Sequence, residues 1–172
     1  PAEMGYLGAA ALLPHLLLSL PAGVWLDRVA RRRRILITSD LARAALLASV
    51  PIAYGFDALT MGQLYAVAFG TGCFAVFFDL SYPTVFVSVT PREQYLEGNS
   101  LIHGSRSFSY VAGPSVGGLL VQAFSAPFAI LADAVSYLLS ALFLGQVRAP
   151  ETPVEAVEGG MRSRAAEGLR VI

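Results

Sequence analysis

Residues 4–54 comprise MGYLGAAALLPHLLLSLPAGVWL (4–26), DRVARRRR (27–34) and ILITSDLARAALLASVPIAY (35–54), two apolar stretches on either side of a basic segment. The first stretch is interrupted only by His15. A helix needs about 20 apolar residues to cross the hydrocarbon core of a bilayer. Because both stretches reach that length, they predict two transmembrane helices joined by a loop over residues 27–34.

Three more stretches of the same kind follow, over residues 61–85, 100–123 and 127–147. Turn-forming or charged residues separate them, notably at 90–98. No stretch alternates between apolar and polar residues with a period of two, which argues against strands. We therefore expect an all-α polytopic membrane protein with five spans. A soluble helical bundle is the alternative, but five such helices in succession with almost no polar face disfavour it.

The composition agrees with lipid as the solvent. Of the 172 residues, 55% are hydrophobic and only 14% are charged, whereas soluble domains carry about 25% charged residues. The net charge is zero, which argues against nucleic acid as a partner. The single cysteine, Cys73, lies inside an apolar run, where we expect it to act as a small packing residue.

The arginines predict how the chain is oriented. They concentrate in the loops 27–34 and 90–98 and in the tail 148–172, and the other two loops have none. Because cytoplasmic loops are enriched in Lys and Arg, we expect these three segments to be cytoplasmic in a multi-pass protein of the cell membrane. The tail is expected to be flexible and to contain the start of a surface helix. The run at 31–34 is alternatively a nucleic-acid or anionic-lipid patch, although its position between two spans is explained by topology alone.

The first loop carries a motif of known type. It resembles the signature between the second and third helices of the major facilitator superfamily: Gly, three residues, Asp, Arg, one residue, Gly, then basic residues. The matching residues are Gly23, Asp27, Arg28, Arg31 and Arg32. Ala30 stands where the pattern has its second Gly, and Trp25 where it often has Leu. Asp27 stands at a helix end among five arginines, so we expect it to be ionised and paired. The resemblance implies that this loop latches one conformational state, and a solvated loop that serves only topology is the alternative.

A second motif lies in the fourth stretch, where residues 113–118 read GPSVGG. This segment resembles the Gly-Pro-x-x-Gly-Gly motif in the fifth helix of antiporters of the same superfamily. Its matching residues are Gly113, Pro114, Gly117 and Gly118. Small residues at a spacing of four let helix backbones approach closely in lipid, and Pro114 favours a kink. The resemblance places this face at the interface between two halves of a carrier, and plain helix packing is compatible with that role.

The resemblance extends to the exporter branch that includes macrolide efflux proteins and the enterobactin exporter, through residues 40–43, 91–93, 99–100 and 131–137. It implies five of the six helices of the N-terminal half, so we expect a fragment of a longer chain. It further implies proton-driven export of hydrophobic or amphipathic small molecules by alternating access. The implied partners are the bilayer, a small-molecule substrate and the remaining helices, with no cofactor beyond the proton gradient. A uniporter or importer of the same fold and an inactive truncated product are alternatives, and an enzyme would need clustered catalytic residues that are not found.

Ionisable residues inside the spans are candidates for function because burying them is costly. Asp40 and Arg43 are three residues apart on one helix face, so a local pair is expected. Asp79 and Arg106 are both expected about 10 Å from the cytoplasmic surface. We therefore predict that they meet across the loop 90–98 as a salt bridge.

Asp133 is expected about 9 Å below the outer surface, with no arginine at its depth. A carboxyl group without a partner in lipid favours its neutral form and can take up a proton reversibly, so Asp133 is the candidate for proton coupling. A structural, hydrogen-bonded acid is the alternative. His15 and His103 are expected in opposite halves of the bilayer without further ligands, which argues against a metal site.

Overall fold

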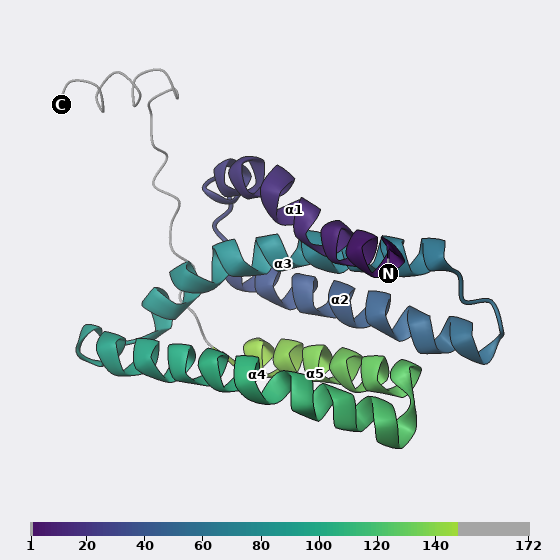
Figure 1. Cartoon of the computed structure of the whole chain (residues 1–172). Coiled ribbons are helices and arrows are strands. Elements are labelled where there is room, and N and C mark those ends of the chain that lie inside the picture. Colours follow the sequence, from purple (N-terminus) through teal and green to yellow (C-terminus); the bar gives the residue numbers. More distant parts are fainter. Residues whose placement is uncertain (1, 148–172) are drawn as a thin grey trace.

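The computed structural model describes the backbone of residues 2–147 and the side chains of residues 5–147. Over this part of the chain five α-helices follow one another, without a strand (Figure 1). They are α1 (Ala2–Leu26), α2 (Arg32–Gly55), α3 (Met61–Val89), α4 (Tyr95–Phe124) and α5 (Ala126–Gln146), and a short 3₁₀-helix, η1 (Arg92–Gln94), precedes α4. The prediction of an all-helical membrane protein is confirmed. The predicted tail 148–172 lies outside the described residues.

Four of the helices are long and apolar enough to cross a membrane: Gly5–Leu26 of α1, and the whole of α2, α3 and α5. The remaining helix, α4, has 30 residues and is long enough at about 1.5 Å per residue, but its Ser, Asn, His and Arg side chains make it more polar. The span over residues 100–123 therefore stays a prediction, which the length of α4 and its pairing with α5 support.

The helices pack as neighbours in the order α1, α3, α2, α5 and α4 (Figure 1). Their fully buried side chains are few, among them Leu26, Leu36 and Val76. Large apolar side chains face outward instead, and Leu16 and Leu20 of α1 are 81% and 83% exposed. This distribution fits lipid, in which apolar side chains gain little by packing against each other rather than against acyl chains.

A glycine sets the distance between α1 and α3. A Cβ atom at Gly72 would lie 2.6 Å from the backbone oxygen of Ala11 and 3.0 Å from Cγ of Pro14. Pro14 is itself fully buried. In lipid, such small residues let two backbones come together, so Gly72 fixes how α1 lies on α3.

Two loops are shorter than the sequence predicted. The first was expected over 27–34, but α2 already begins at Arg32. The third was expected over 90–98, but α4 begins at Tyr95. Gly98 was taken for a turn residue, whereas it lies inside α4, where a Cβ atom would meet the ring of Phe86 at 2.9 Å. This glycine therefore permits a close contact between helices rather than ending one.

We predict that Gly72→Ala destabilises the protein by about 1–3 kcal/mol, the usual cost of overpacking, because the clash involves the backbone oxygen of Ala11, which no side-chain rotation relieves. Thermal unfolding of the purified protein in detergent measures the change. Gly62→Ala on the same helix is the matched control, since its new Cβ would meet only Oγ1 of Thr60 at 3.9 Å. Equal melting temperatures for the two variants would contradict the close approach.

Candidate functional site

The arginine segment, residues 28–34, connects α1 to α2 and also contacts α5. The N–H of Asp27 donates to the carbonyl of Gly23 at 3.0 Å and closes the last turn of α1. The Asp27 carboxylate then pairs with Arg32, with Oδ1 and Nη2 3.3 Å apart. Arg28 and Arg31 are exposed. The sequence predicted that Asp27 is paired with an arginine, and the structure identifies Arg32 as this partner; the role of the loop as a conformational latch stays a prediction.

Arg33 attaches the start of α2 to the end of α5. Its Nε donates to the carbonyl of Leu144 at 2.8 Å, and its Nη2 donates to the carbonyl of Gly145. The last carbonyl groups of a helix have no partner within the helix and carry partial negative charge. The Arg33 guanidinium group is therefore favourably placed at the end of α5. This contact offsets the unfavourable position of its charge in the first turn of α2, and α2 can begin within the arginine segment.

A buried ion pair lies where α2, α3 and α5 meet. Asp40 and Arg43 have side chains only 1% and 8% exposed, with Oδ1 and Nη1 3.6 Å apart. Ser140 of α5 donates a hydrogen bond of 2.6 Å to Oδ2 of Asp40. The guanidinium carbon of Arg43 lies 5.1 Å from the ring centre of Phe78 and 5.2 Å from that of Tyr137. The local pair expected from sequence thus connects three helices, and cation–π contacts add to its stability.

A second group of charges, the Asp79 cluster, joins α1, α3 and α4. Oδ2 of Asp79 lies 3.6 Å from Nε2 of His15, and its Oδ1 lies 4.0 Å from Nη2 of Arg106. The three side chains are half-exposed. The sequence predicted the contact between Asp79 and Arg106, and the structure brings the two side chains together.

The helix bounds give the position of this cluster along α3 and α4. Asp79 lies ten residues before the end of α3, and Arg106 lies eleven residues after the start of α4. At about 1.5 Å per residue both are roughly 15 Å from these helix ends. Both helices, with 29 and 30 residues, are longer than a hydrocarbon core about 30 Å thick requires, so their ends extend beyond it. The expected depth of about 10 Å from the cytoplasmic surface therefore stays a prediction.

The sequence analysis also missed His15 as a partner of Asp79. It assigned His15 and His103 to opposite halves of the bilayer, whereas His15 lies eleven residues before the end of α1 and Asp79 ten residues before the end of α3, which places the two side chains at the same level. Counting residues back from the two arginine-bearing loops, 27–34 for His15 and 90–98 for Asp79, would have found this agreement. Among the described residues, no group of three His, Cys, Asp or Glu side chains is arranged to hold a metal ion.

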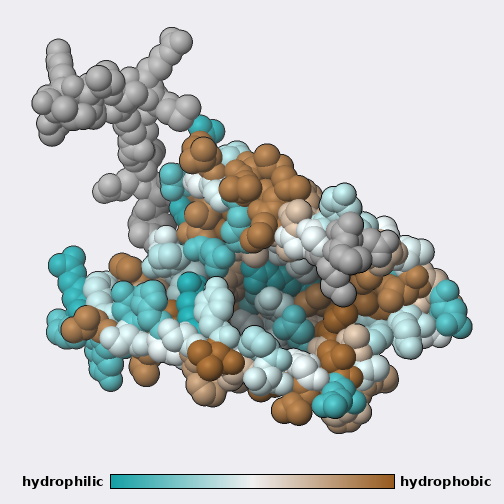
Figure 2. Space-filling view, viewed as in Figure 1, coloured by the Kyte–Doolittle hydropathy of each residue, from teal (hydrophilic) through white to brown (hydrophobic). Residues whose placement is uncertain are grey.

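The Asp79 cluster opens into a hollow between α3 and α4 of about 410 Å³. Hydrophilic side chains gather in the recess between the layer of α1 and α3 and the layer of α4 and α5 (Figure 2). Aromatic rings line the same part of α3, and Tyr82 stacks on both Phe78 and Phe86 at 6.0 and 6.5 Å between centres. Asn99 and His103 of α4 complete the wall. The volume lies within the range of small-molecule sites, and half of the lining residues are charged, imidazole or amide side chains beside the aromatic rings.

The remaining predicted residues lie on faces that no described helix covers. Asp133 of α5 is exposed, and its Oδ1 lies 3.5 Å from Oγ of Ser136. On α4, a Cβ atom at Gly113, Gly117 or Gly118 would meet no atom within 4 Å. Both faces are therefore open to lipid or to other helices.

The chain was compared with known proteins. The model of the Major Facilitator Superfamily matches residues 1–171. The multidrug efflux pump Tap of Mycolicibacterium fortuitum is 31% identical over 179 residues, which is 95% of this chain and 42% of Tap. The Tap pump of Mycobacterium tuberculosis (strain ATCC 25618 / H37Rv) is 28% identical over 99% of this chain and 42% of its own.

The putative bacilysin exporter BacE of Bacillus subtilis is 26% identical over 78% of this chain and 33% of BacE. The chain thus spans less than half the length of these relatives. No solved structure gives a significant match.

Replacing Asp40 by Asn should destabilise the protein by about 3–5 kcal/mol, because Arg43 would then be a buried charge without its counter-ion. The double variant Asp40→Leu, Arg43→Met removes both charges and should recover most of the loss. Asp27→Asn is the matched control on an exposed carboxylate and should cost about 1 kcal/mol or less. Thermal unfolding in detergent ranks the variants, and a fully stable Asp40→Asn protein would show that Arg43 does not need this carboxylate.

Proposed function

The chain belongs to the Major Facilitator Superfamily, a family of membrane transporters, and on this basis we propose that it forms part of a proton-driven exporter of hydrophobic or amphipathic small molecules. The observation that carries the proposal is the Asp79 cluster, three ionisable side chains inside the long helices α1, α3 and α4 beside a hollow with aromatic walls. Ionisable groups within membrane spans are costly and mark pathways for substrates and protons. The similarity to the multidrug efflux pump Tap and to the putative bacilysin exporter BacE supports export as the direction of transport.

The walls of the hollow indicate the kind of substrate. Aromatic rings of α3 offer flat apolar contacts, while Asp79, Asn99 and His103 offer polar ones. A molecule with both an apolar body and a polar or cationic group would use both surfaces. This combination favours drug-like, macrolide-like or siderophore-like amphipathic compounds over small polar nutrients.

The helix contacts are suited to alternating access. In this mechanism two halves of a carrier rock about a site near the bilayer midplane. The Asp27–Arg32 pair and the Arg33 contacts lie at the helix ends, where rocking would break and re-form them; such contacts would latch one conformational state. We place these ends, with the loop around η1, on the cytoplasmic side because their arginines follow the positive-inside rule.

Two carboxylates are candidates for the coupling proton, Asp79 and Asp133. Asp79 faces His15 from α1 and Arg106 from α4, with His103 also lining its hollow. A proton on Asp79 would weaken its attraction to both partners and loosen α4 from α3. In the described part of the chain, the Asp133 carboxylate has one weak hydrogen-bond contact, with Ser136 of its own helix, so a proton on it would change its hydration rather than a link between helices.

The full-length protein, expressed in a drug-sensitive host, should export a fluorescent amphipathic substrate, and a protonophore should abolish this export. Asp79→Asn and Asp133→Asn identify the proton carrier: the responsible variant should still bind substrate but lose the export that depends on the proton gradient. Glu97→Gln, at the start of α4, is the control and should keep it. Export that persists in the protonophore, or in both Asn variants, would contradict proton coupling at these groups.

The exposed glycine face of α4 should matter only in the assembled carrier. Gly117→Leu should sharply reduce export, because the open face around Gly113 and Gly117 would no longer admit the backbone of a partner helix. Val111→Leu, which adds one methylene group elsewhere on α4, is the control and should keep export. Substrate efflux at equal membrane expression measures the effect, and normal export by Gly117→Leu would argue that this face meets only lipid.

A further inference from the structure

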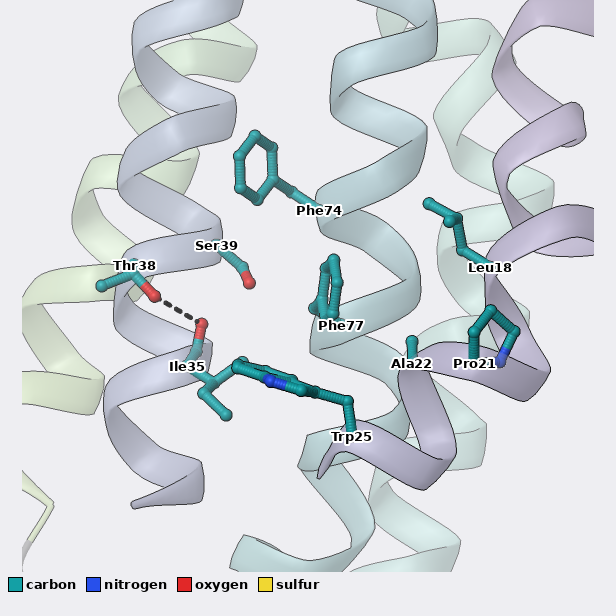
Figure 3. Close-up of a pocket in the computed structure, with 9 residues that line it drawn as sticks. All are labelled: Leu18, Pro21, Ala22, Trp25, Ile35, Thr38, Ser39, Phe74 and Phe77. Carbon is teal, nitrogen blue, oxygen red and sulfur yellow. Dashed lines mark hydrogen bonds between the residues drawn. The ribbon is translucent and has the colours of Figure 1, made fainter. Parts of the chain in front are cut away.

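A second hollow lies near the end of α1, away from the Asp79 cluster. It has a volume of about 480 Å³ and is an open hollow lined by residues of α1, α2 and α3 (Figure 3). Leu18 and Trp25 line it from α1, Ile35 from α2, and Phe74 and Phe77 from α3. The Trp25 ring packs edge-on against Phe77 with 5.9 Å between centres. The charged cluster and its hollow, proposed above for the substrate, share none of these residues.

The walls of this hollow suit a hydrocarbon chain rather than a polar molecule. Two of the nine lining residues, Thr38 and Ser39, carry a hydroxyl group. The Thr38 hydroxyl is already hydrogen-bonded within its own helix, to the carbonyl of Ile35 at 3.1 Å (Figure 3) and to that of Arg34 at 2.9 Å. The other walls are apolar or aromatic, so a flexible acyl chain fits better than a ligand that needs hydrogen bonds.

The arginine segment is flanked in the sequence by residues that line the hollow. Trp25 lies in the last turn of α1 and Ile35 in the first turns of α2, so residues 27–34 connect two of its walls. Arg32 and Arg33 are engaged within the protein. Arg28 and Arg34 are exposed, and neither forms an ion pair with any residue that the structure describes. Two exposed arginines therefore lie close in sequence to the walls of the apolar hollow. Trp25, one of these walls, is half-exposed, and Trp is typical of the membrane interface.

We propose that this hollow binds one acyl chain of an anionic phospholipid, whose phosphate group is held by Arg28 and Arg34. Charge complementarity selects this occupant: a zwitterionic lipid offers the same acyl chain but no net charge for two guanidinium groups that have no ion-pair partner within residues 5–147. Basic pockets between transmembrane helices on the cytoplasmic side are the places where anionic headgroups bind. The inference rests on the cytoplasmic orientation of the arginine segment given with the proposed function.

The site has a consequence for the carrier, because the same segment contains the Asp27–Arg32 pair and the Arg33 contacts. A phosphate group on Arg28 and Arg34 would lower the repulsion among the closely spaced arginines. It would therefore favour the state in which Arg32 and Arg33 keep their contacts. The anionic lipid is thus a regulator of the latch and not a substrate.

Trp25, the only tryptophan of this chain, provides the measurement. The full-length protein is reconstituted in phosphatidylcholine vesicles, and phosphatidylglycerol or phosphatidylcholine with brominated acyl chains is titrated in. Quenching assigned to Trp25, by difference from Trp25→Phe, should require roughly 10- to 30-fold less brominated phosphatidylglycerol, since each arginine near an anionic lipid contributes about fivefold. Arg28→Gln, Arg34→Gln should remove this preference.

The controls separate the other outcomes. Arg92→Gln, a change in the other basic loop, should keep the preference for phosphatidylglycerol. Equal quenching by both lipids would mean ordinary annular lipid, and the absence of quenching would mean that another helix covers the hollow; either result overturns the proposal. Selective quenching in a protein that fails to export drugs would leave the lipid site standing and count against the proposed function alone.

Discussion

The hydrocarbon core offers no water to an ionised group, and this constraint organises the whole arrangement of helices. A charge buried there costs several kcal/mol unless it is paired or hydrated. Asp40 and Arg43 are therefore buried together, with Ser140 and two aromatic rings completing their surroundings. Because these partners come from α2, α3 and α5, satisfying one ion pair also fixes how three helices pack. Asp79 does the same for α1, α3 and α4, but more openly and beside a hollow.

The two groups of charges differ in exposure, and this difference is the reason for proposing a structural role for one and a functional role for the other. The buried ion pair has almost no access to solvent, so any change in its charge would leave a partner uncompensated. Asp79 is about half exposed and has one weakly held partner on each side. A group with such contacts can exchange partners during a conformational change, whereas Asp40 cannot without unpacking the helices. The same side-chain chemistry thus forms a fixed connection in the buried ion pair and an accessible set of contacts beside a hollow in the Asp79 cluster.

Features that depend on the spacing of residues along the chain could be predicted from the sequence. Stretches of about 20 apolar residues predict spans, an i,i+3 spacing predicts that Asp40 meets Arg43, and a carboxylate among arginines predicts the pairing of Asp27. Contacts across helices were harder, because they depend on crossing angles and on the depth of each residue. His15 was missed for this reason. Gly98 was assigned to the loop because a glycine in a sequence is compatible both with the end of a helix and with a close contact between two helices. The rings around Arg43 likewise come from α3 and α5, whose side-by-side packing with α2 no local pattern reveals.

The arginine segment shows how one short stretch meets several demands at once. Orientation requires only that the positive charges lie on one side of the membrane, and any arrangement of the side chains would satisfy it. The structure is more specific: Arg32 pairs with Asp27, and Arg33 caps the end of α5, so these two bind α1, α2 and α5 together at one end of the molecule. Arg28 and Arg34 instead face outward, where they raise the local positive potential without a protein partner among the described residues. Such a potential disfavours the helix-end contacts through repulsion unless an anion neutralises it, so the stability of the contacts that join the helices depends on the charge of the surrounding leaflet.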